Sequence, residues 1–305
     1  MKVNTFRADT RSIDKTTGEY VDPLMKWPLR GAAFTNEIGE ALRPLIGNAA
    51  TICWAPALMY IGADIYDKYK NDKTEYSPNS RRLLEQAIFQ GMASIFLPLV
   101  AVKAGQNLFS QFGRLGSDRM AVNTKERICN TAENFIANGQ MHAYHNREVE
   151  CIKAFRERVH NTIDYFKSEE VERNIFAKIS HNIEKIFFKK DIDNIEKYSD
   201  ATIKDLIDAR KQLLNPSEEF KTTQIYKDYR KAISKEQTQN VAIKSALTKF
   251  QQKKMLKGRF IKTIGGFLAL GLLIKPIDRF VENVLIGKVI SPQLSKERNN
   301  KKEIS

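Results

Sequence analysis

The chain has 305 residues, of which 42% are hydrophobic and 28% are charged, and its formal net charge is +14. So large a charged share excludes a polytopic transporter, because most of this chain has to meet water. The basic excess predicts an acidic partner, and anionic lipid and nucleic acid are the leading candidates.

The N-terminal segment, residues 1–43, is polar and mixed in charge. Its first 20 residues lack the apolar core of a cleavable secretory signal, so we expect none. Trp27 lies either at a membrane interface, where an aromatic ring with a polar edge is favoured, or in a local fold. The three cysteines of the chain are widely spaced and odd in number, which predicts a reducing compartment without a disulfide framework.

Two apolar stretches dominate the first third of the chain. Residues 44–63 contain 20 residues without an ionisable side chain, a length that rises about 30 Å as a helix. Residues 86–102 add 17 uncharged residues, and the connector 64–83 is rich in turn-forming residues. The pair predicts an apolar helical hairpin over residues 44–109 in a membrane. The alternative is a buried hairpin of a soluble protein, but a helix that is apolar on every side needs protein on every side.

Two prolines and several charged residues add detail to the predicted hairpin. Pro56 and Pro98 lie inside the apolar stretches and predict kinked helices or a re-entrant hairpin packed against other protein. Charged residues where the helices meet the connector are expected to pair across the hairpin, because unpaired charges near hydrocarbon are costly. The expected hairpin ion pairs involve Asp64, Asp67, Arg81 and Arg82.

The middle of the chain is expected to be a soluble helical region. Residues 110–123 contain two glycines and predict a linker. Beyond it, apolar residues recur every three or four positions, which is typical of amphipathic helices, and no stretch alternates as a strand would. We therefore predict an all-α fold whose residues 120–257 form a helical bundle or a coiled-coil hairpin. The apolar stripe comprises Ile152, Phe155, Val159, Ile163, Phe166, Ile175, Ile179, Ile183 and Ile186.

A third apolar stretch follows within residues 258–292. It spans Thr263–Ile274, and its 12 residues are too few to cross a membrane alone. Flanking lysines could snorkel to opposite interfaces, or the helix could dip into one leaflet while the amphipathic segment 276–290 lies along the surface. We prefer the second arrangement. Residues 293–305 form a polar tail.

A polybasic segment precedes this stretch. No acidic residue occurs between Gln237 and Ile277, whereas eight Lys and Arg residues do. A basic run beside an apolar helix suits an anionic leaflet, at about 1 kcal/mol per basic residue near the surface. A solvated basic helix is the alternative. The predicted lipid-binding residues are Lys249, Lys253, Lys254, Lys257, Arg259 and Lys262.

One group of residues has metal-binding atoms but not the spacing of a metal site. His142, His145, Glu148 and Cys151 recur every third residue, and positions three apart drift by about 60° around a helix. The pattern matches none of the compact zinc motifs, so we expect an ordinary helix surface with Cys151 as a packed thiol. The sequence shows no phosphate loop and no nucleophile turn. We expect no cofactor, no metal and no enzymatic activity.

These features favour a membrane-anchored interaction or scaffold module. The hairpin and the C-terminal apolar helix would meet in the bilayer, and the middle region would project into the cytoplasm to bind a protein partner or a second copy. The polybasic segment favours this orientation, but Lys68 and other basic residues of the connector favour the opposite one. A re-entrant hairpin or a soluble fold would remove the conflict.

Two other functions stay open. The first is a soluble basic helical protein that binds nucleic acid non-specifically through residues 244–262. The second is a subunit of an oligomeric channel or transporter, with Asn48, Gln86 and Gln90 lining a path between helices.

Overall fold

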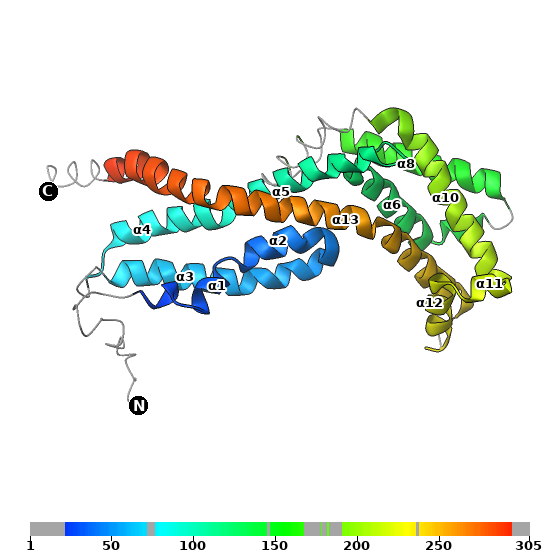
Figure 1. Cartoon of the computed structure of the whole chain (residues 1–305), viewed down its shortest axis with the longest axis horizontal. Helices are drawn as coiled ribbons and strands as arrows, with labels where there is room; N and C mark the ends of the chain where they lie inside the picture. The colour runs from blue at the N-terminus through cyan, green and yellow to red at the C-terminus, as the bar shows by residue number, and fades with distance from the viewer. Residues whose placement is uncertain are drawn as a thin grey trace. The chain divides into compact units, whose positions relative to one another are not determined.

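All the regular elements of the described residues are helices, which confirms the all-α prediction (Figure 1). The chain divides into two compact units, unit 1 formed by Met1–Gly105 with Gly266–Ser305, and unit 2 formed by Gln106–Gly265. The structure is a computed structural model that describes residues 22–71, 77–144, 147–167, 191–235 and 238–294, together with Lys178 and Asn182. Outside the described residues lie His145, most of the polar tail, and Ile175, Ile179, Ile183 and Ile186 of the expected stripe.

In unit 1 the first apolar stretch is not one helix, as we had expected, but a reversal between two helices. Gly47 ends α2 with a φ of 58°, a backbone conformation that favours glycine. A Cβ atom on Gly39 would lie 2.6 Å from the Cβ of Cys53, which shows that the chain folds back onto α2. No charged residue marks the turn, and its polar residues are only Asn48 and Thr51, so composition alone did not single it out. The elements are η2 (Pro23–Met25), α1 (Leu29–Ala32), α2 (Thr35–Ile46), η3 (Gly47–Cys53) and α3 (Trp54–Lys70).

The expected hairpin does form, and its two arms begin with α3 and α4 on either side of the connector. The backbone N–H of Asn79 donates to the carbonyl of Tyr69 at 2.9 Å, and the Asn79 side chain caps α4 by accepting from the N–H of Arg81. Pro56 falls in the first turn of α3, whereas Pro98 follows η4 inside the continuous helical run of residues 80–115. Proline has no N–H to donate, so at Pro98 neighbouring turns have to satisfy the freed carbonyl. The second arm consists of α4 (Ser80–Phe89), the π-helical η4 (Gln90–Phe96), α5 (Leu97–Ser110) and η5 (Gln111–Leu115).

The C-terminal apolar stretch belongs to a much longer helix than expected. Helix α13 (Gln239–Phe280) continues through Pro276 into the π-helical η7 (Val281–Ile290), so the helical run reaches 56 residues. The prediction of a short dipping helix followed by a separate surface helix is therefore wrong. A proline inside a long apolar helix removes one hydrogen bond, and neighbouring turns re-satisfy the freed carbonyl.

Segments from both ends of the chain pack together in unit 1. Ala41 of α2, Val102 of α5 and Leu270 of α13 form a small buried cluster. Directly after η7, the carbonyl of Ser291 accepts from Arg81 Nη2 at 3.0 Å, and its hydroxyl donates to Glu85 at 2.7 Å. These contacts hold the C-terminal helix against α2, α4 and α5.

Unit 2 is a helical bundle around an aromatic and aliphatic core. Phe155, Val159 and Ile163 of the predicted stripe are buried in this core, together with Phe135 and Leu247. Residues 110–123, expected to be a linker, belong to unit 2, where Met120 is fully buried while residues 115–119 are exposed. Unit 2 contains α6 (Val122–Ala137), α7 (Gln140–Ala143), α8 (Glu148–Lys167), α10 (Ile192–Leu214), α11 (Glu218–Lys221), α12 (Gln224–Ile233) and the first part of α13.

One buried carboxylate links several segments of this bundle. Asp191 precedes α10 and is fully buried. It accepts hydrogen bonds from Arg114 Nε at 2.9 Å, from the N–H of Ala121 at 3.3 Å and from the hydroxyl of Thr124 at 2.5 Å. The carboxylate thus fixes η5 and the start of α6 against α10.

We expect Asp191→Ala to destabilise unit 2 by about 3–5 kcal/mol, because it leaves a largely buried guanidinium without this acceptor. The matched control is Asp118→Ala, which removes the half-exposed partner of Lys125 at 2.9 Å and is expected to cost at most about 1 kcal/mol. Thermal or denaturant unfolding of the two variants measures the difference. Equal losses would contradict the structural role of Asp191.

Candidate membrane surface and buried polar network

Three helical runs are long and apolar enough to cross a membrane, by length and composition: residues 35–70, 80–115 and 239–294. The first includes the reversal at η3, so its spanning part is α3, whose 17 residues rise about 25 Å, at the short end of the spanning range. Between 17% and 28% of the residues in the apolar windows of these runs are buried. The other described residues therefore leave most of each apolar window uncovered, whereas the core of a soluble protein is covered.

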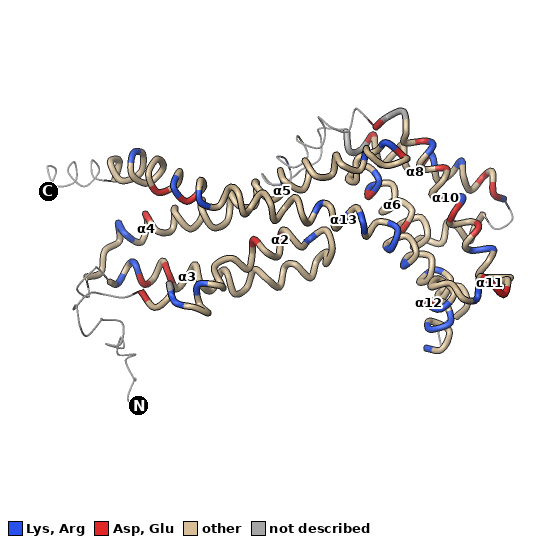
Figure 2. Tube along the Cα trace, in the orientation of Figure 1, with Lys and Arg blue, Asp and Glu red and all other residues tan. Residues whose placement is uncertain are grey.

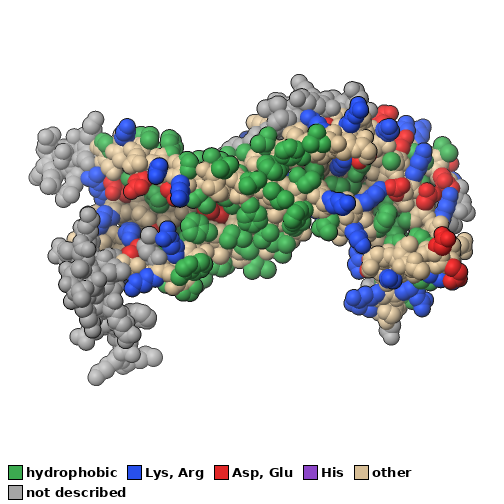
Figure 3. All heavy atoms as spheres, in the orientation of Figure 1, with side chains coloured by type: hydrophobic (Ala, Val, Ile, Leu, Met, Phe, Trp, Pro, Cys, Tyr) green, Lys and Arg blue, Asp and Glu red, His purple; other side chains and the backbone are tan. Residues whose placement is uncertain are grey.

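Large apolar side chains of unit 1 point outward from several helices. Ile52 and Met59 are each 76% exposed, and Leu272 of α13 is 73% exposed. In Figure 3 hydrophobic side chains gather along α13. Exposed apolar surfaces of this kind mark contact with a membrane or another protein. Further members of the exposed apolar set in unit 1 are Ile38, Ile46, Leu58, Phe267, Leu268, Leu273, Phe280, Val284 and Val289.

Basic residues gather at the end of unit 1 where α3 and α4 are joined (Figure 2). Lys68 pairs with Asp22 at 2.7 Å, and Arg81 pairs with Glu85 at 2.9 Å. Arg82 donates to the carbonyl of Lys68 at 3.2 Å. Acids and carbonyls of unit 1 thus bind some of the basic residues near the connector. These are the residues whose position favoured the opposite orientation in the membrane.

Each residue of the expected hairpin ion pairs has at least one partner outside that set. Asp64 is 4% exposed and accepts a hydrogen bond from Gln90 Nε2 at 2.6 Å and another from Gln86 Nε2. Its partners on the second arm are therefore amides of α4 and η4 rather than guanidinium groups. Asp67 accepts from Asn71 at 2.9 Å, Arg81 pairs within its own helix, and Arg82 donates to backbone carbonyls near the connector.

A chain of polar groups continues from Asp64 into α2. Gln90 Oε1 accepts from the hydroxyl of Ser94 at 2.6 Å, and the carbonyl of Ser94 accepts from Asn36 Nδ2 at 2.7 Å. Asn36 Oδ1 is buried without a hydrogen-bond partner among the described residues. Sequence analysis missed Asn36 and Ser94. The four-residue spacing of Gln86, Gln90 and Ser94, which puts them on one face of a helix, was the available signal.

Glu40 of α2 is another buried acid of unit 1, and its carboxylate has several partners. Glu40 is 4% exposed, accepts from Arg43 Nε at 2.8 Å and from Trp54 Nε1 at 3.0 Å, and lies 3.7 Å from Lys103 Nζ. Buried charges persist when they are paired and hydrogen-bonded in this way. The tryptophan contact also holds the start of α3 against α2.

Acids of unit 2 engage half of the predicted lipid-binding residues. Arg259 and Lys262 share Glu126 of α6, at 3.3 Å and 2.5 Å. Lys254 forms an ion pair with Asp205 of α10. These three side chains fasten α13 to the bundle, which the sequence could not show because their acidic partners lie more than 40 positions away.

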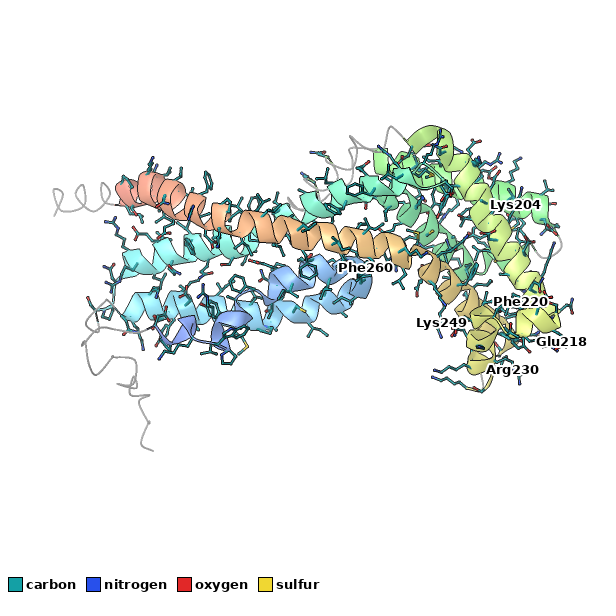
Figure 4. The ribbon with its side chains drawn as sticks, viewed as in Figure 1. Lys204, Glu218, Phe220, Arg230, Lys249 and Phe260 are labelled. Atoms are coloured by element: carbon teal, nitrogen blue, oxygen red, sulfur yellow. The ribbon has the colours of Figure 1, made fainter. Side chains whose placement is uncertain are left out.

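The other three predicted lipid-binding residues make no ion pair with a described residue. Lys249, Lys253 and Lys257 are spaced by four along α13 and are exposed. Lys249 and Lys253 line a groove of about 590 Å³ that also contains Phe220 (Figure 4). Its acidic side chains are Asp205, Asp208 and Asp228. Phe260, one turn after Lys257, is 55% exposed, so this face of α13 is both basic and apolar.

The members of the His–Glu–Cys pattern that are described have different partners. His142 Nδ1 lies 3.2 Å from Arg210 Nη2, and Glu148 pairs with Lys211. Cys151 is 2% exposed, and burial raises the pKa of its thiol, as expected for a packed cysteine. Among the described residues no group of three or more His, Cys, Asp or Glu side chains could hold a metal ion.

Comparison with known proteins adds no functional assignment. No protein family matches the chain, and no curated protein or solved structure is significantly similar to it.

Proposed function

We propose that the protein is a membrane-anchored helical interaction module without enzymatic activity. Unit 1 embeds in the bilayer, and unit 2 lies in the cytoplasm and binds a protein partner or a second copy of the chain. The observation that carries the proposal is the exposure of large apolar side chains on α3 and α13. A soluble monomer would leave these side chains in water, which is unfavourable by about 25 cal/mol per Å².

The polar interior of unit 1 is compatible with this location. A polar group in hydrocarbon is costly unless it is hydrogen-bonded inside the protein. Asp64 and Glu40 are both buried and both have hydrogen-bond donors from neighbouring helices. Such contacts join α2, α3 and η4 in lipid, where expulsion from water does not drive helices together.

Contact with anionic lipid is proposed for the free basic face of α13, formed by Lys249, Lys253 and Lys257. Lys254, Arg259 and Lys262 are less available because they pair with Asp205 and Glu126. The same ion pairs weaken the case for nucleic-acid binding through residues 244–262. A path lined by Asn48, Gln86 and Gln90 is also less well supported, since Asn48 is exposed on η3 while both glutamines donate to Asp64.

We expect the full chain to remain with isolated membranes through extraction with alkaline carbonate as well as high salt. Carbonate removes peripheral proteins, whereas helices inserted in hydrocarbon stay. Immunoblotting of the pellet and supernatant gives the result. Release by salt alone would contradict the proposal and would make the exposed apolar surface a protein interface.

The two halves of the basic segment are expected to behave differently when neutralised. The triple variant Lys249→Gln, Lys253→Gln, Lys257→Gln should lose up to roughly 3 kcal/mol of preference for anionic over zwitterionic lipid. The matched triple variant Lys254→Gln, Arg259→Gln, Lys262→Gln removes the same charge but should mainly lower the melting temperature.

Spin-labelled anionic lipid in bilayers containing the reconstituted protein measures the first effect, and circular dichroism on heating measures the second. Equal loss of lipid preference in both variants would contradict the assignment, as would no loss in the first.

A further inference from the structure

A small pocket in unit 2 has an apolar floor. It lies between the end of α6, α7, α10 and the start of α13, and its volume is about 190 Å³. Ile136, Met141, Ile243 and Leu247 line it, and each is at most 5% exposed. The floor therefore offers buried hydrocarbon contact to anything that enters.

Three basic side chains, His142, Arg210 and Lys244, line the same pocket, and its lining contains no Asp or Glu. Arg210 Nη2 lies 3.2 Å from His142 Nδ1. Because a guanidinium only donates, Nδ1 of His142 is the acceptor in this hydrogen bond, and Nε2 is the ring nitrogen left to donate. Burial lowers the pKa of Arg210 from its ordinary value, as expected for a cation partly removed from water.

Arg210 also lines a second, smaller cavity of about 40 Å³ that contains Met141 and Cys151. The acid of that cavity, Glu148, pairs with Lys211. Arg210 of α10 therefore lines both cavities. Arg210 is half-buried, and a guanidinium beside hydrocarbon favours an anion, because charge-assisted hydrogen bonds are roughly twice as strong as neutral ones.

We propose that this pocket binds a short-chain aliphatic carboxylate, whose head group pairs with Arg210 while its chain lies on the apolar floor. The planar fork of arginine matches a carboxylate in geometry as well as in charge. Lys244 supplies a second positive charge, and His142 Nε2 supplies a neutral donor. The volume is well below the roughly 300–1,000 Å³ of pockets for drug-sized ligands, which limits the chain to a few methylene groups.

The test uses the full chain in detergent micelles and hexanoate labelled with ¹³C at its carboxyl carbon. We expect saturable binding, seen as a shift of the carboxyl resonance beyond that in empty micelles. Affinity should rise roughly fourfold for each methylene group from butanoate to hexanoate. Hexanol and hexylamine of the same chain length should bind at least tenfold more weakly than hexanoate, as measured by competition for the labelled ligand.

Variants separate the pocket from general charge effects. Arg210→Gln should weaken hexanoate binding at least tenfold, whereas Arg230→Gln, on the exposed surface of α12 (Figure 4), should leave it unchanged. Circular dichroism checks that both variants fold. If Arg210→Gln does not fold, Lys244→Gln at the pocket rim replaces it, with a severalfold loss expected.

Three results would each overturn the proposal. They are the absence of saturable binding, equal affinity for hexanoate and hexanol, and equal loss in the Arg210 and Arg230 variants. Because none of them depends on where unit 1 resides, failure here is distinguishable from failure of the membrane assignment.

Discussion

The absence of cover over the apolar faces of α3 and α13 is the constraint on which the rest of unit 1 depends. Met59 and Leu272 protrude from the faces of these helices that no other described segment shields. In hydrocarbon such faces are favourable, but every polar group between them must then find a partner inside the protein. Asp64 and Glu40 meet that condition through amides, a guanidinium and an indole N–H. With unit 1 in the bilayer, as proposed, the polar network and the apolar surface both follow from the same environment.

Much of this architecture could be predicted from the sequence, because it follows from local patterns of apolar residues. The apolar stretches and the stripe through Phe155, Val159 and Ile163 follow from composition and from the 3.6-residue period. The reversal at Gly47 and the continuity through Pro276 could not be predicted in the same way. The first is a turn that contains no charged residue, and the second is a proline that stands inside one long continuous helix.

The basic residues also show the difference between what a local sequence pattern predicts and what tertiary contacts add. The polybasic run from Lys249 to Lys262 is plain in the sequence and suggests a single basic face. In the structure Arg259 and Lys262 converge on Glu126, more than 130 positions earlier in the chain, while Lys253 and Lys257 have no such partner. Helix periodicity places side chains around one axis, but it does not say which helix will pack there. Net charge thus indicated an acidic partner without showing that half of the run already has acidic partners within the protein.

The most direct test of the membrane assignment is the environment of single side chains on α13 in a reconstituted bilayer. Nitroxide labels would replace Leu272 and, as a water-exposed reference, Val149 of α8, which is 81% exposed, in a chain whose native cysteines have been replaced. The account predicts that Leu272 collides readily with oxygen and rarely with a water-soluble nickel complex, whereas Val149 shows the opposite pattern. Nickel accessibility at Leu272 equal to that at Val149 would contradict it.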